Sequence, residues 1–219
     1  MRFEEMCVIA PTITAETAED YKAQIERVHT FAERVHIDIS DGEFAPSFLV
    51  GAAQIWWPQD WTVDIHAMVA RPSDHLDTLV SLKPNMIIFH AETNEDIVPI
   101  LKHIKKFDIK AGIALLRSTV PSTVAAAIEA ADHVMIFSGD LGKQGGTASL
   151  MQLEKVRLIR AIRQDVEIGW DGGVTVENAF SLSQGGVDVL NVGSTIATAD
   201  DPKSVYATLV NEINKHGVI

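Results

Sequence analysis

The chain has 219 residues, of which 47% are hydrophobic and 22% charged, and its formal net charge is -12. This composition is typical of a globular protein with a buried core. The acidic excess argues against nucleic acid or an anionic membrane as a partner, because both require a basic surface. Cys7 is the single cysteine, which excludes an intrachain disulfide and favours a reducing compartment. The amino terminus lacks the pattern of a secretory signal, and no segment approaches the roughly 18 apolar residues of a transmembrane helix, so we expect a cytoplasmic protein.

Short runs of β-type residues recur along the chain and alternate with amphipathic stretches. The predicted strands, in chain order, span residues 6–10, 34–39, 62–69, 85–90, 110–116, 133–138, 166–170 and 187–193. The clearest predicted helices span residues 15–33, 94–107 and 150–164. The connection 43–61 departs from this alternation, and we expect a loop with a short helix there. Its Trp56-Trp57 pair could be either an exposed contact or part of the core.

Eight strands that alternate with helices predict a parallel sheet covered by helices. Each unit is about 27 residues long, which fits a compact (β/α)8 TIM barrel, an α/β fold of roughly 200 to 400 residues. The main alternative is an open, doubly wound sheet. That alternative lacks its best signal, because no Gly-x-Gly-x-x-Gly motif follows the first predicted strand. We therefore predict one (β/α)8 barrel domain over residues 1–219.

Ionisable side chains gather at the carboxyl ends of three predicted strands, where barrel enzymes carry their chemistry. His36 and Asp38 share a face of the second strand, because side chains two residues apart in a strand point the same way. His66 lies near the end of the third strand and Asp171 at the tip of the seventh. Taken singly, such histidines are more often core residues and such aspartates caps or turn formers. Together, two imidazoles and two carboxylates predict a site for Zn²⁺, Mn²⁺, Fe²⁺ or Co²⁺.

Other ionisable residues near the strand ends have simpler explanations. His90, at the end of the fourth predicted strand, could reach the rim of the barrel, and a structural role fits it equally well. Asp41 follows the second strand in an Asp-Gly turn, and Asp64 lies too deep in the third strand to reach a substrate.

Glycines at the ends of the last two predicted strands indicate an anion site. Gly172 and Gly173 follow the seventh strand, Gly193 ends the eighth, and Ser194 comes directly after it. Glycines allow backbone N–H groups to face an anion, and a helix amino terminus adds partial positive charge. Phosphate sites recur after strands seven and eight of this architecture. A metal beside such a site suggests a phosphorylated substrate that is activated at a carbonyl group.

Several separated segments resemble the ribulose-phosphate 3-epimerase family in order and spacing, over nearly the whole chain. They are HIDISDG, DIHAMVARPSDHL, IIFHAET, WDGGVTVENA and VDVLNVGS. The resemblance implies a (β/α)8 barrel that binds a divalent metal, with Zn²⁺ expected first, through His36, Asp38, His66 and Asp171. It also implies the interconversion of D-ribulose 5-phosphate and D-xylulose 5-phosphate. Near relatives act on hexulose phosphates such as allulose 6-phosphate.

The resemblance further implies a two-base mechanism. Asp38 would remove the proton at C3 from one face, giving a cis-enediolate stabilised by the metal, and Asp171 would return a proton to the other face. Homo-oligomers are common in the family, so we expect one here. With the glycines above, the expected substrate- and phosphate-binding residues are Thr12, His66, Met68, Gly142, Lys143, Gly145, Gly172, Gly173, Gly193 and Ser194.

Departures from the family motifs bear on the identity of the substrate. Thr12 stands where the family usually has a serine, Ser40 replaces the methionine of H-x-D-x-M-D-G, and Phe137 replaces a methionine at the end of strand six. The segment 138-SGDLGKQGGTAS-149 also differs from the family loop T-V-N-P-G-F-G-G-Q, which covers the substrate and touches its phosphate. Two alternatives therefore stay open. One is a 3-epimerase for another phosphorylated sugar such as a hexulose 6-phosphate, and the other is a sugar-phosphate-binding relative without turnover.

Overall fold

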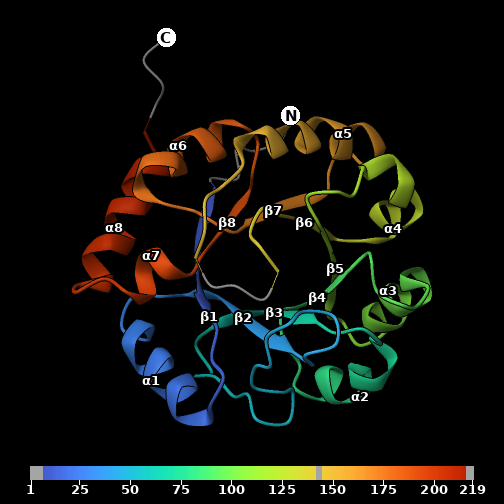
Figure 1. The fold of residues 1–219 in the computed structure, drawn as a ribbon, viewed down its shortest axis with the longest axis horizontal. Coiled ribbons are helices and arrows are strands. Elements are labelled where there is room, and N and C mark those ends of the chain that lie inside the picture. The colour runs from blue at the N-terminus through green and yellow to red at the C-terminus, as the bar shows by residue number, and fades with distance from the viewer. Residues whose placement is uncertain (1–6, 142–144, 216–219) are drawn as a thin grey trace.

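The computed structural model describes residues 7–141 and 145–215, which form a closed barrel of eight parallel strands surrounded by helices (Figure 1). The strands are β1 (Val8–Ile13), β2 (Arg34–Ser40), β3 (Thr62–Met68), β4 (Met86–His90), β5 (Lys110–Leu115), β6 (His133–Phe137), β7 (Glu167–Asp171) and β8 (Val189–Val192). The α-helices are α1 (Ala18–Val28), α2 (Ser73–Ser81), α3 (Ile97–Lys105), α4 (Ala125–Ala130), α5 (Glu154–Ile162), α6 (Val176–Gln184), α7 (Ser194–Ala197) and α8 (Pro202–Ile213). Two short 3-10 helices, Pro121–Val124 and Leu150–Leu153, precede α4 and α5.

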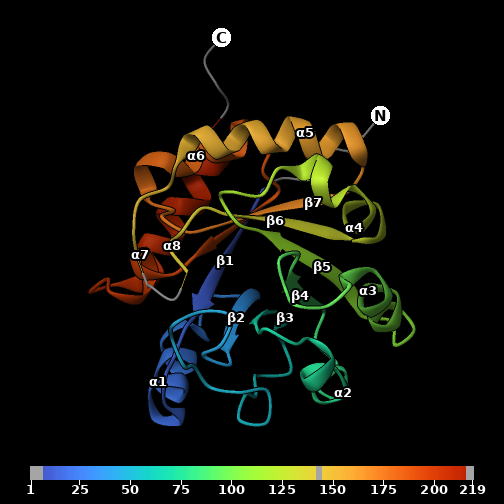
Figure 2. The same cartoon turned by 45° about the vertical axis from the view of Figure 1, so that its right-hand side comes forward.

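Each strand pairs in parallel with the next along the chain, and β1 also pairs with β8, which closes the barrel. Figure 2 shows the helices lying outside the strands along the flank of the barrel. The predicted (β/α)8 barrel is confirmed, and the open doubly wound sheet is excluded.

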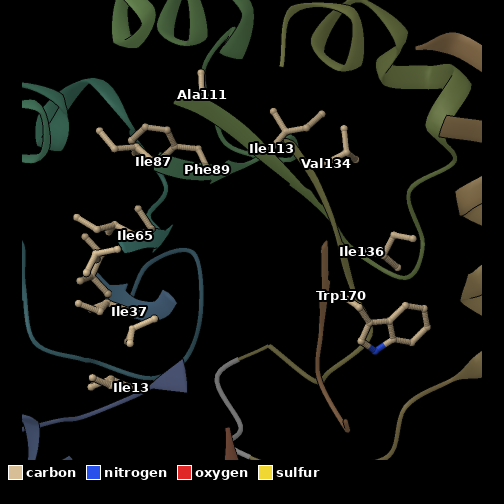
Figure 3. Packing of buried hydrophobic residues seen from close by; sticks show 14 of the residues in the cluster. Ile13, Ile37, Ile65, Ile87, Phe89, Ala111, Ile113, Val134, Ile136 and Trp170 are labelled. Carbon is tan, nitrogen blue, oxygen red and sulfur yellow. The ribbon is translucent and has the colours of Figure 1, made fainter. Parts of the chain in front are cut away.

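Successive side chains of each strand alternate between an apolar outer side, which faces the helices, and the barrel interior. Ile37, Ile65 and Trp170 are fully buried and point outward, beneath the helices (Figure 3). The residue that follows each of them therefore faces the interior, because successive side chains of a strand point to opposite faces. This alternation brings polar side chains from several strands together inside the barrel.

Helix α1 illustrates how the outer layer is specified. The Thr17 side chain caps it by accepting a hydrogen bond from the backbone N–H of Asp20. Tyr21, Ile25 and Val28 are buried, and their spacing places them on one face of the helix against the barrel. Among the described helices, none combines the length and the apolar character needed to cross a membrane.

Several element boundaries differ from the predicted ones. Strand β1 continues to Ile13 rather than ending at residue 10, so Thr12 lies inside the strand. Helix α1 is shorter than the predicted 15–33, and the predicted helix 150–164 begins with a 3-10 turn. These differences follow from local hydrogen bonding at the element ends, which the apolar periodicity does not encode.

The connection between β2 and β3 contains no helix anywhere in residues 41–61, all of which the structure describes, so the expected short helix there is wrong. Pro46 and Pro58 interrupt the segment and remove backbone donors that a helix would need. Asp41 organises the first part of the loop, because its side chain accepts hydrogen bonds from the backbone N–H groups of Glu43, Phe44 and Ala70. Further along, Trp56 is 47% exposed and Trp57 is half-buried.

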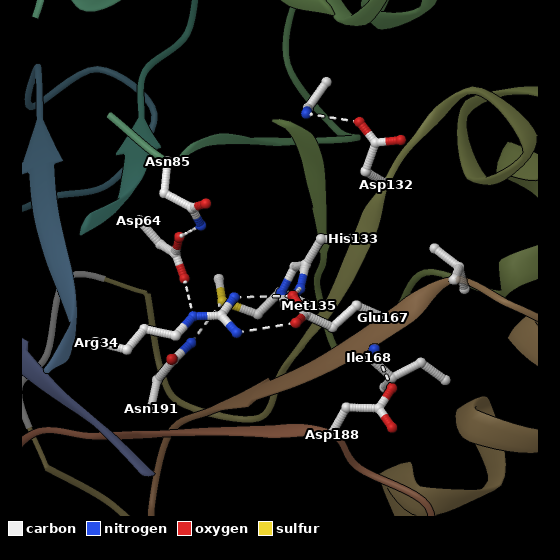
Figure 4. A network of polar contacts seen from close by, with 12 residues as sticks. Arg34, Asp64, Asn85, Asp132, His133, Met135, Glu167, Ile168, Asp188 and Asn191 are labelled. Carbon is white, nitrogen blue, oxygen red and sulfur yellow. Dashed lines mark hydrogen bonds and ion pairs between the residues drawn. The ribbon is translucent and has the colours of Figure 1, made fainter. Parts of the chain in front are cut away.

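Buried ion pairs fill the amino-terminal end of the barrel interior (Figure 4). Arg34 donates from Nε to Asp64 Oδ2 at 2.6 Å, and from its two terminal nitrogens to the carboxylate of Glu167 at 2.9 and 2.8 Å. Asn85 also donates to Asp64, and His133 Nδ1 lies 2.7 Å from Glu167 Oε2. This network, called the Arg34 network below, ties β2, β3 and β7 together. Asp64 takes part in this network at the amino-terminal end of the barrel, in agreement with the expectation that it lies too deep in β3 to reach a substrate.

Candidate active site

The four residues predicted to bind a metal converge at the carboxyl-terminal ends of β2, β3 and β7. One donor atom from each of His36, Asp38, His66 and Asp171 lies within 4.8 Å of the other three. His66 Nδ1 is 2.9 Å from Asp38 Oδ1 and 3.8 Å from Asp171 Oδ2. His36 Nε2 is 3.3 and 3.8 Å from the same two oxygens. The geometry is a compact cluster of two imidazoles and two carboxylates.

The residues present fit a divalent metal. His36 is fully buried, and neither ring nitrogen has a hydrogen-bond partner among the described residues. Buried polar atoms are rarely left unpaired, so a bare imidazole nitrogen beside two carboxylates matches the requirements of a metal ligand. Imidazole and carboxylate donors together suit zinc and the first-row transition metals. The cluster could therefore hold the predicted ion.

The two carboxylates of the cluster have opposite pKa shifts in the metal-free protein. Burial opposes ionisation of Asp38, but the neighbouring imidazoles of His36 and His66 outweigh this effect and lower its pKa well below the usual range. In Asp171, burial and the negative charge of Asp38 dominate and raise the pKa. The shifts are opposite because the two carboxyl groups are close together, so the negative charge of ionised Asp38 opposes ionisation of Asp171.

The second oxygen of Asp38 is held by a residue that sequence reasoning missed. Thr14, just beyond β1, donates from its hydroxyl to Asp38 Oδ2 at 2.7 Å. Gln24 of α1 fixes the Thr14 backbone from both sides, because its Oε1 accepts from the Thr14 N–H at 3.2 Å and its Nε2 donates to the Thr14 carbonyl at 2.8 Å. Asp38 is thus oriented through both of its oxygens.

Behind the cluster, His66 contacts a second buried histidine. His66 Nε2 lies 2.9 Å from His90 Nε2, and His90 Nδ1 lies 3.4 Å from Glu92 Oε2. The other oxygen of Glu92 accepts hydrogen bonds from the Leu116 N–H at 2.9 Å and from the Thr119 hydroxyl. Burial lowers the pKa of His90 to about 4, which leaves its ring neutral at pH 7. His90 is absent from the described wall of the cavity and instead lies against His66, so the alternative that it reaches the rim is not favoured.

A cavity of about 450 Å³ adjoins the cluster at the mouth of the barrel. This volume is within the range of small-molecule sites, roughly 300 to 1,000 Å³. Asp38 and Asp171 line the cavity. So do these predicted substrate-binding residues: Thr12, Met68, Gly145, Gly172, Gly173, Gly193 and Ser194. His66 is fully buried behind this wall, and the predicted contacts Gly142 and Lys143 lie outside the described residues.

Thr12 and Phe137 shape the cavity in different ways. The Thr12 hydroxyl is buried and has no hydrogen-bond partner among the described residues, and Thr12 is one of the residues that line the cavity. Phe137 lines the cavity, and its ring centroid lies 6.0 Å from that of His66. Ser40, in contrast, donates to the Ser47 carbonyl at 2.7 Å and holds the loop after β2. Of these departures from the family pattern, Phe137 directly alters the cavity wall and Ser40 supports a loop.

Gly172 and Gly173 hold the β6–α5 loop, defined as residues 138–149, against the turn after β7. Their φ angles are +102° and +70°, in the region that favours glycine. A Cβ at Gly172 would come within 2.1 Å of the Gly139 nitrogen, and one at Gly173 within 2.1 Å of the Ala148 nitrogen. Close backbone packing therefore requires both glycines, in addition to any role they have toward an anion.

Two curated relatives resemble the chain over most of its length. The ribulose-phosphate 3-epimerase of Aquifex aeolicus is 29% identical over 204 residues, which cover 90% of this chain and 92% of the relative. The enzyme of the same name from Helicobacter pylori is 29% identical over 210 residues, with 93% and 96% covered.

Solved structures share the fold at low identity. The 3-hexulose-6-phosphate synthase of Salmonella typhimurium has a TM-score of 0.69 at 14% identity, covering 94% of this chain and 98% of the other. Tryptophan synthase of Mycobacterium tuberculosis has a TM-score of 0.72 at 15% identity, covering 97% and 94%. Such distant likeness shows the barrel alone.

A family model provides the assignment. The model described as the ribulose-phosphate 3 epimerase family matches residues 8–197, a range that includes all eight strands and the whole cluster. The chain therefore belongs to the ribulose-phosphate 3 epimerase family, and it is an isomerase of the epimerase type.

Proposed function

We propose that the chain is a metal-dependent 3-epimerase that interconverts D-ribulose 5-phosphate and D-xylulose 5-phosphate. The observation that carries the proposal is the placement of Asp38 and Asp171, from two separate strands, beside two histidines and a cavity of substrate size. The named activity of the Aquifex aeolicus and Helicobacter pylori relatives supports the choice of substrate.

His36, Asp38, His66 and Asp171 would hold the divalent ion, with Zn²⁺ expected first and Fe²⁺, Mn²⁺ or Co²⁺ as alternatives. When bound, the ion supplies positive charge that stabilises the negative charge developing on the substrate oxygens. That help is needed because a proton next to a ketone is too weakly acidic for an unassisted carboxylate at neutral pH.

The two carboxylates move the proton. Asp38 takes the proton from C3 on one face of the sugar, an enediolate is left, and Asp171 delivers a proton to the opposite face. The roles exchange in the reverse reaction. Positioned acid–base groups of this kind contribute about 10²- to 10⁴-fold to the rate.

Backbone N–H groups would bind the substrate phosphate at Gly172, Gly173, Gly193 and Ser194, which all line the cavity. The unpaired Thr12 hydroxyl and Met68 would contact the sugar. Gly145 lines the same cavity. Gly142 and Lys143 are proposed as further phosphate contacts on the sequence alone.

A 3-epimerase for a hexulose 6-phosphate is the second candidate. Phe137 favours it, because this ring forms part of the cavity wall where the family has a methionine. The changed sequence of the β6–α5 loop points the same way. A binding protein without turnover is disfavoured by Asp38 and Asp171, since binding alone does not need two carboxylates from separate strands at one cavity.

Proton NMR of the purified, metal-analysed protein with ribulose 5-phosphate in D₂O tests the proposal. Xylulose 5-phosphate with deuterium at C3 is the expected product. Deuterium exchange without epimerisation would contradict the pairing of Asp38 with Asp171. If the metal-loaded protein produces neither result, ribulose 5-phosphate is ruled out as the substrate. The same assay with hexulose 6-phosphates then decides between the second candidate and a binding protein.

We also propose a cytoplasmic homo-oligomer. A rice relative that is 28% identical over 209 residues is described as a cytoplasmic isoform, which supports the location. The half-exposed Trp56 offers an apolar side chain to a contact between copies. Size-exclusion chromatography with light scattering tests the oligomeric state, and a monomer at micromolar concentration would contradict it.

A further inference from the structure

The contact between His66 and His90 constrains where the ring protons lie. Both side chains are fully buried, and their Nε2 atoms are 2.9 Å apart. At this distance one nitrogen must carry a proton and the other must accept it, because two bare nitrogens or two N–H groups would repel. Further along, His90 Nδ1 faces Glu92 Oε2 at 3.4 Å. The three side chains form a continuous row that leads away from the metal cluster.

Metal binding by His66 selects one arrangement of this row. The atom of His66 that faces Asp38 and Asp171 is Nδ1, and a nitrogen that binds a metal must be free of its proton. The His66 proton then sits on Nε2 and is donated to His90 Nε2. The proton of His90 consequently sits on Nδ1, toward Glu92. Glu92 Oε2 faces this nitrogen at 3.4 Å, and neither atom has a hydrogen-bond partner among the described residues. An ionised carboxylate only accepts hydrogen bonds, so this arrangement turns the His90 proton toward an unpaired acceptor.

We propose that His90 and Glu92 are positioning residues that hold His66 in the tautomer and orientation that present Nδ1 to the metal. Histidines that bind metals generally donate their second nitrogen to such a partner, and losing the partner weakens metal binding. The inference rests on the metal site of the proposed function and is independent of which sugar phosphate is the substrate.

Glu92 is suited to this role because it is fixed without help from His90. Its Oε1 accepts from the Leu116 N–H and the Thr119 hydroxyl, both beyond the end of β5, which leaves Oε2 directed at His90. The His90 ring is in turn packed between Phe44 and Phe137, at centroid distances of 4.6 and 5.5 Å. These contacts restrict both members of the row.

The substitution Glu92→Gln tests the proposal with little change in volume. The Leu116 N–H keeps the amide oxygen in the place of Oε1, so the new NH2 group faces His90 Nδ1. His90 must then carry its proton on Nε2 and donate it to His66, whose own proton is driven onto Nδ1. We expect Co²⁺ to bind the metal-stripped variant about 10- to 100-fold more weakly than the unmodified chain, measured by titration of the cobalt visible absorption.

Thr119→Val is the matched control, because it removes a contact to Glu92 on the oxygen that does not face His90. We expect this variant to bind Co²⁺ within about threefold of the unmodified chain, a change of less than 1 kcal/mol. A loss equal to that of Glu92→Gln would mean that Glu92 acts only as a brace for the segment after β5, which overturns the proposal. Thermal unfolding of the metal-free variants separates weakened binding from loss of the fold.

A second pair of variants decides the question without Glu92. His90→Gln retains an acceptor for His66 and a donor for Glu92, whereas His90→Phe retains neither, so the glutamine variant should bind Co²⁺ more tightly. Equal affinities of the two variants would contradict the proposal, and so would an unchanged affinity of Glu92→Gln. If the unmodified chain itself fails to bind Co²⁺, the metal site of the proposed function is refuted as well. If the unmodified chain binds and the variants match it, only the positioning role of His90 and Glu92 is overturned.

Discussion

Replacing Arg34 with methionine is expected to destabilise the folded barrel by about 3–5 kcal/mol at pH 7, the usual cost of breaking a buried ion pair by removing one partner. Methionine keeps an unbranched side chain in the same space and removes the guanidinium. Asp64 would then lose its counter-charge, and Glu167 would keep only its contact with His133. The expected loss is a large fraction of the total free energy of unfolding of a typical domain, which is about 5–15 kcal/mol.

The magnitude follows from three hydrogen bonds of the Arg34 network. They measure 2.6, 2.9 and 2.8 Å, and a hydrogen bond to a charged group contributes about 1.5–3 kcal/mol. The side chains of Arg34 and Asp64 are only 14% and 3% exposed, so the loss is close to that of a buried pair. Glu167 is 27% exposed and keeps some hydration, which places the expected value below the simple total of the three bonds.

The pH dependence has a definite sign. Burial raises the pKa of Glu167, but Arg34 and His133 outweigh burial and hold that pKa far below its usual range. A carboxyl group with a lowered pKa in the folded state contributes stability above its unfolded pKa of about 4.3, and this stability is lost as the pH falls toward the lowered value. The difference between the unmodified chain and Arg34→Met should therefore be largest at neutral pH and should shrink below about pH 4.

Urea unfolding, followed by circular dichroism at a series of pH values, measures these differences. The double variant Arg34→Met with Glu167→Gln is the control, because it removes one of the two carboxylate charges that lose Arg34 as a partner, and it should recover part of the lost stability. A loss below about 1 kcal/mol at pH 7, the range of exposed pairs, would refute the reasoning. So would a loss that does not change with pH.

Three further predictions concern the site and its supporting loop. Asp171→Asn should lower epimerisation at least about 10²-fold in the NMR assay with the thermal melt preserved, and an active, metal-loaded variant would rule out the two-base assignment. Thr14→Val should lower kcat about tenfold in steady-state assays, because it removes the donor to Asp38, while Thr14→Ser should stay near the unmodified rate. Equal rates for the two variants would contradict a role for the hydroxyl. Gly173→Ala places a methyl group 2.1 Å from the Ala148 nitrogen at a positive φ, so calorimetry should show a lower Tm, with a loss of at least about 1–3 kcal/mol, and an unchanged Tm would contradict the close packing.

The fold and the cluster of His36, Asp38, His66 and Asp171 could be predicted because both depend on patterns that are local in the sequence. Ile37 and Asp38 lie on opposite sides of β2 whatever the rest of the chain does, and strand ends are marked by turns such as Asp171-Gly172. Once eight parallel strands close into a barrel, their carboxyl ends must meet. Convergence of His66 with the other three residues of the cluster then follows from the architecture.

The contacts that support the cluster could not be predicted, because they join residues with no fixed spacing. Thr14 and Asp38 are 24 residues apart, and Arg34 reaches Glu167 over 133 residues. Such pairs depend on the stagger of the strands at closure, which apolar periodicity does not specify. His133 begins β6, away from the strand ends where chemistry is expected, so its position in the sequence indicates no role. Its pairing with Glu167 shows that a polar residue at the start of a strand can also be buried in the barrel interior when another strand supplies a partner.

The packing of Gly172 and Gly173 fixes the backbone beside Asp171 and leaves the side chains of the β6–α5 loop free to vary. Both ends of the β6–α5 loop, at Gly139 and Ala148, rest on the turn that immediately follows Asp171. The segment between these two anchors can therefore exchange its side chains while the backbone beside Asp171 keeps its place. Sequences that differ between these anchors are thus expected to leave the position of Asp171 unchanged, so this loop and the turn after β7 can diverge independently.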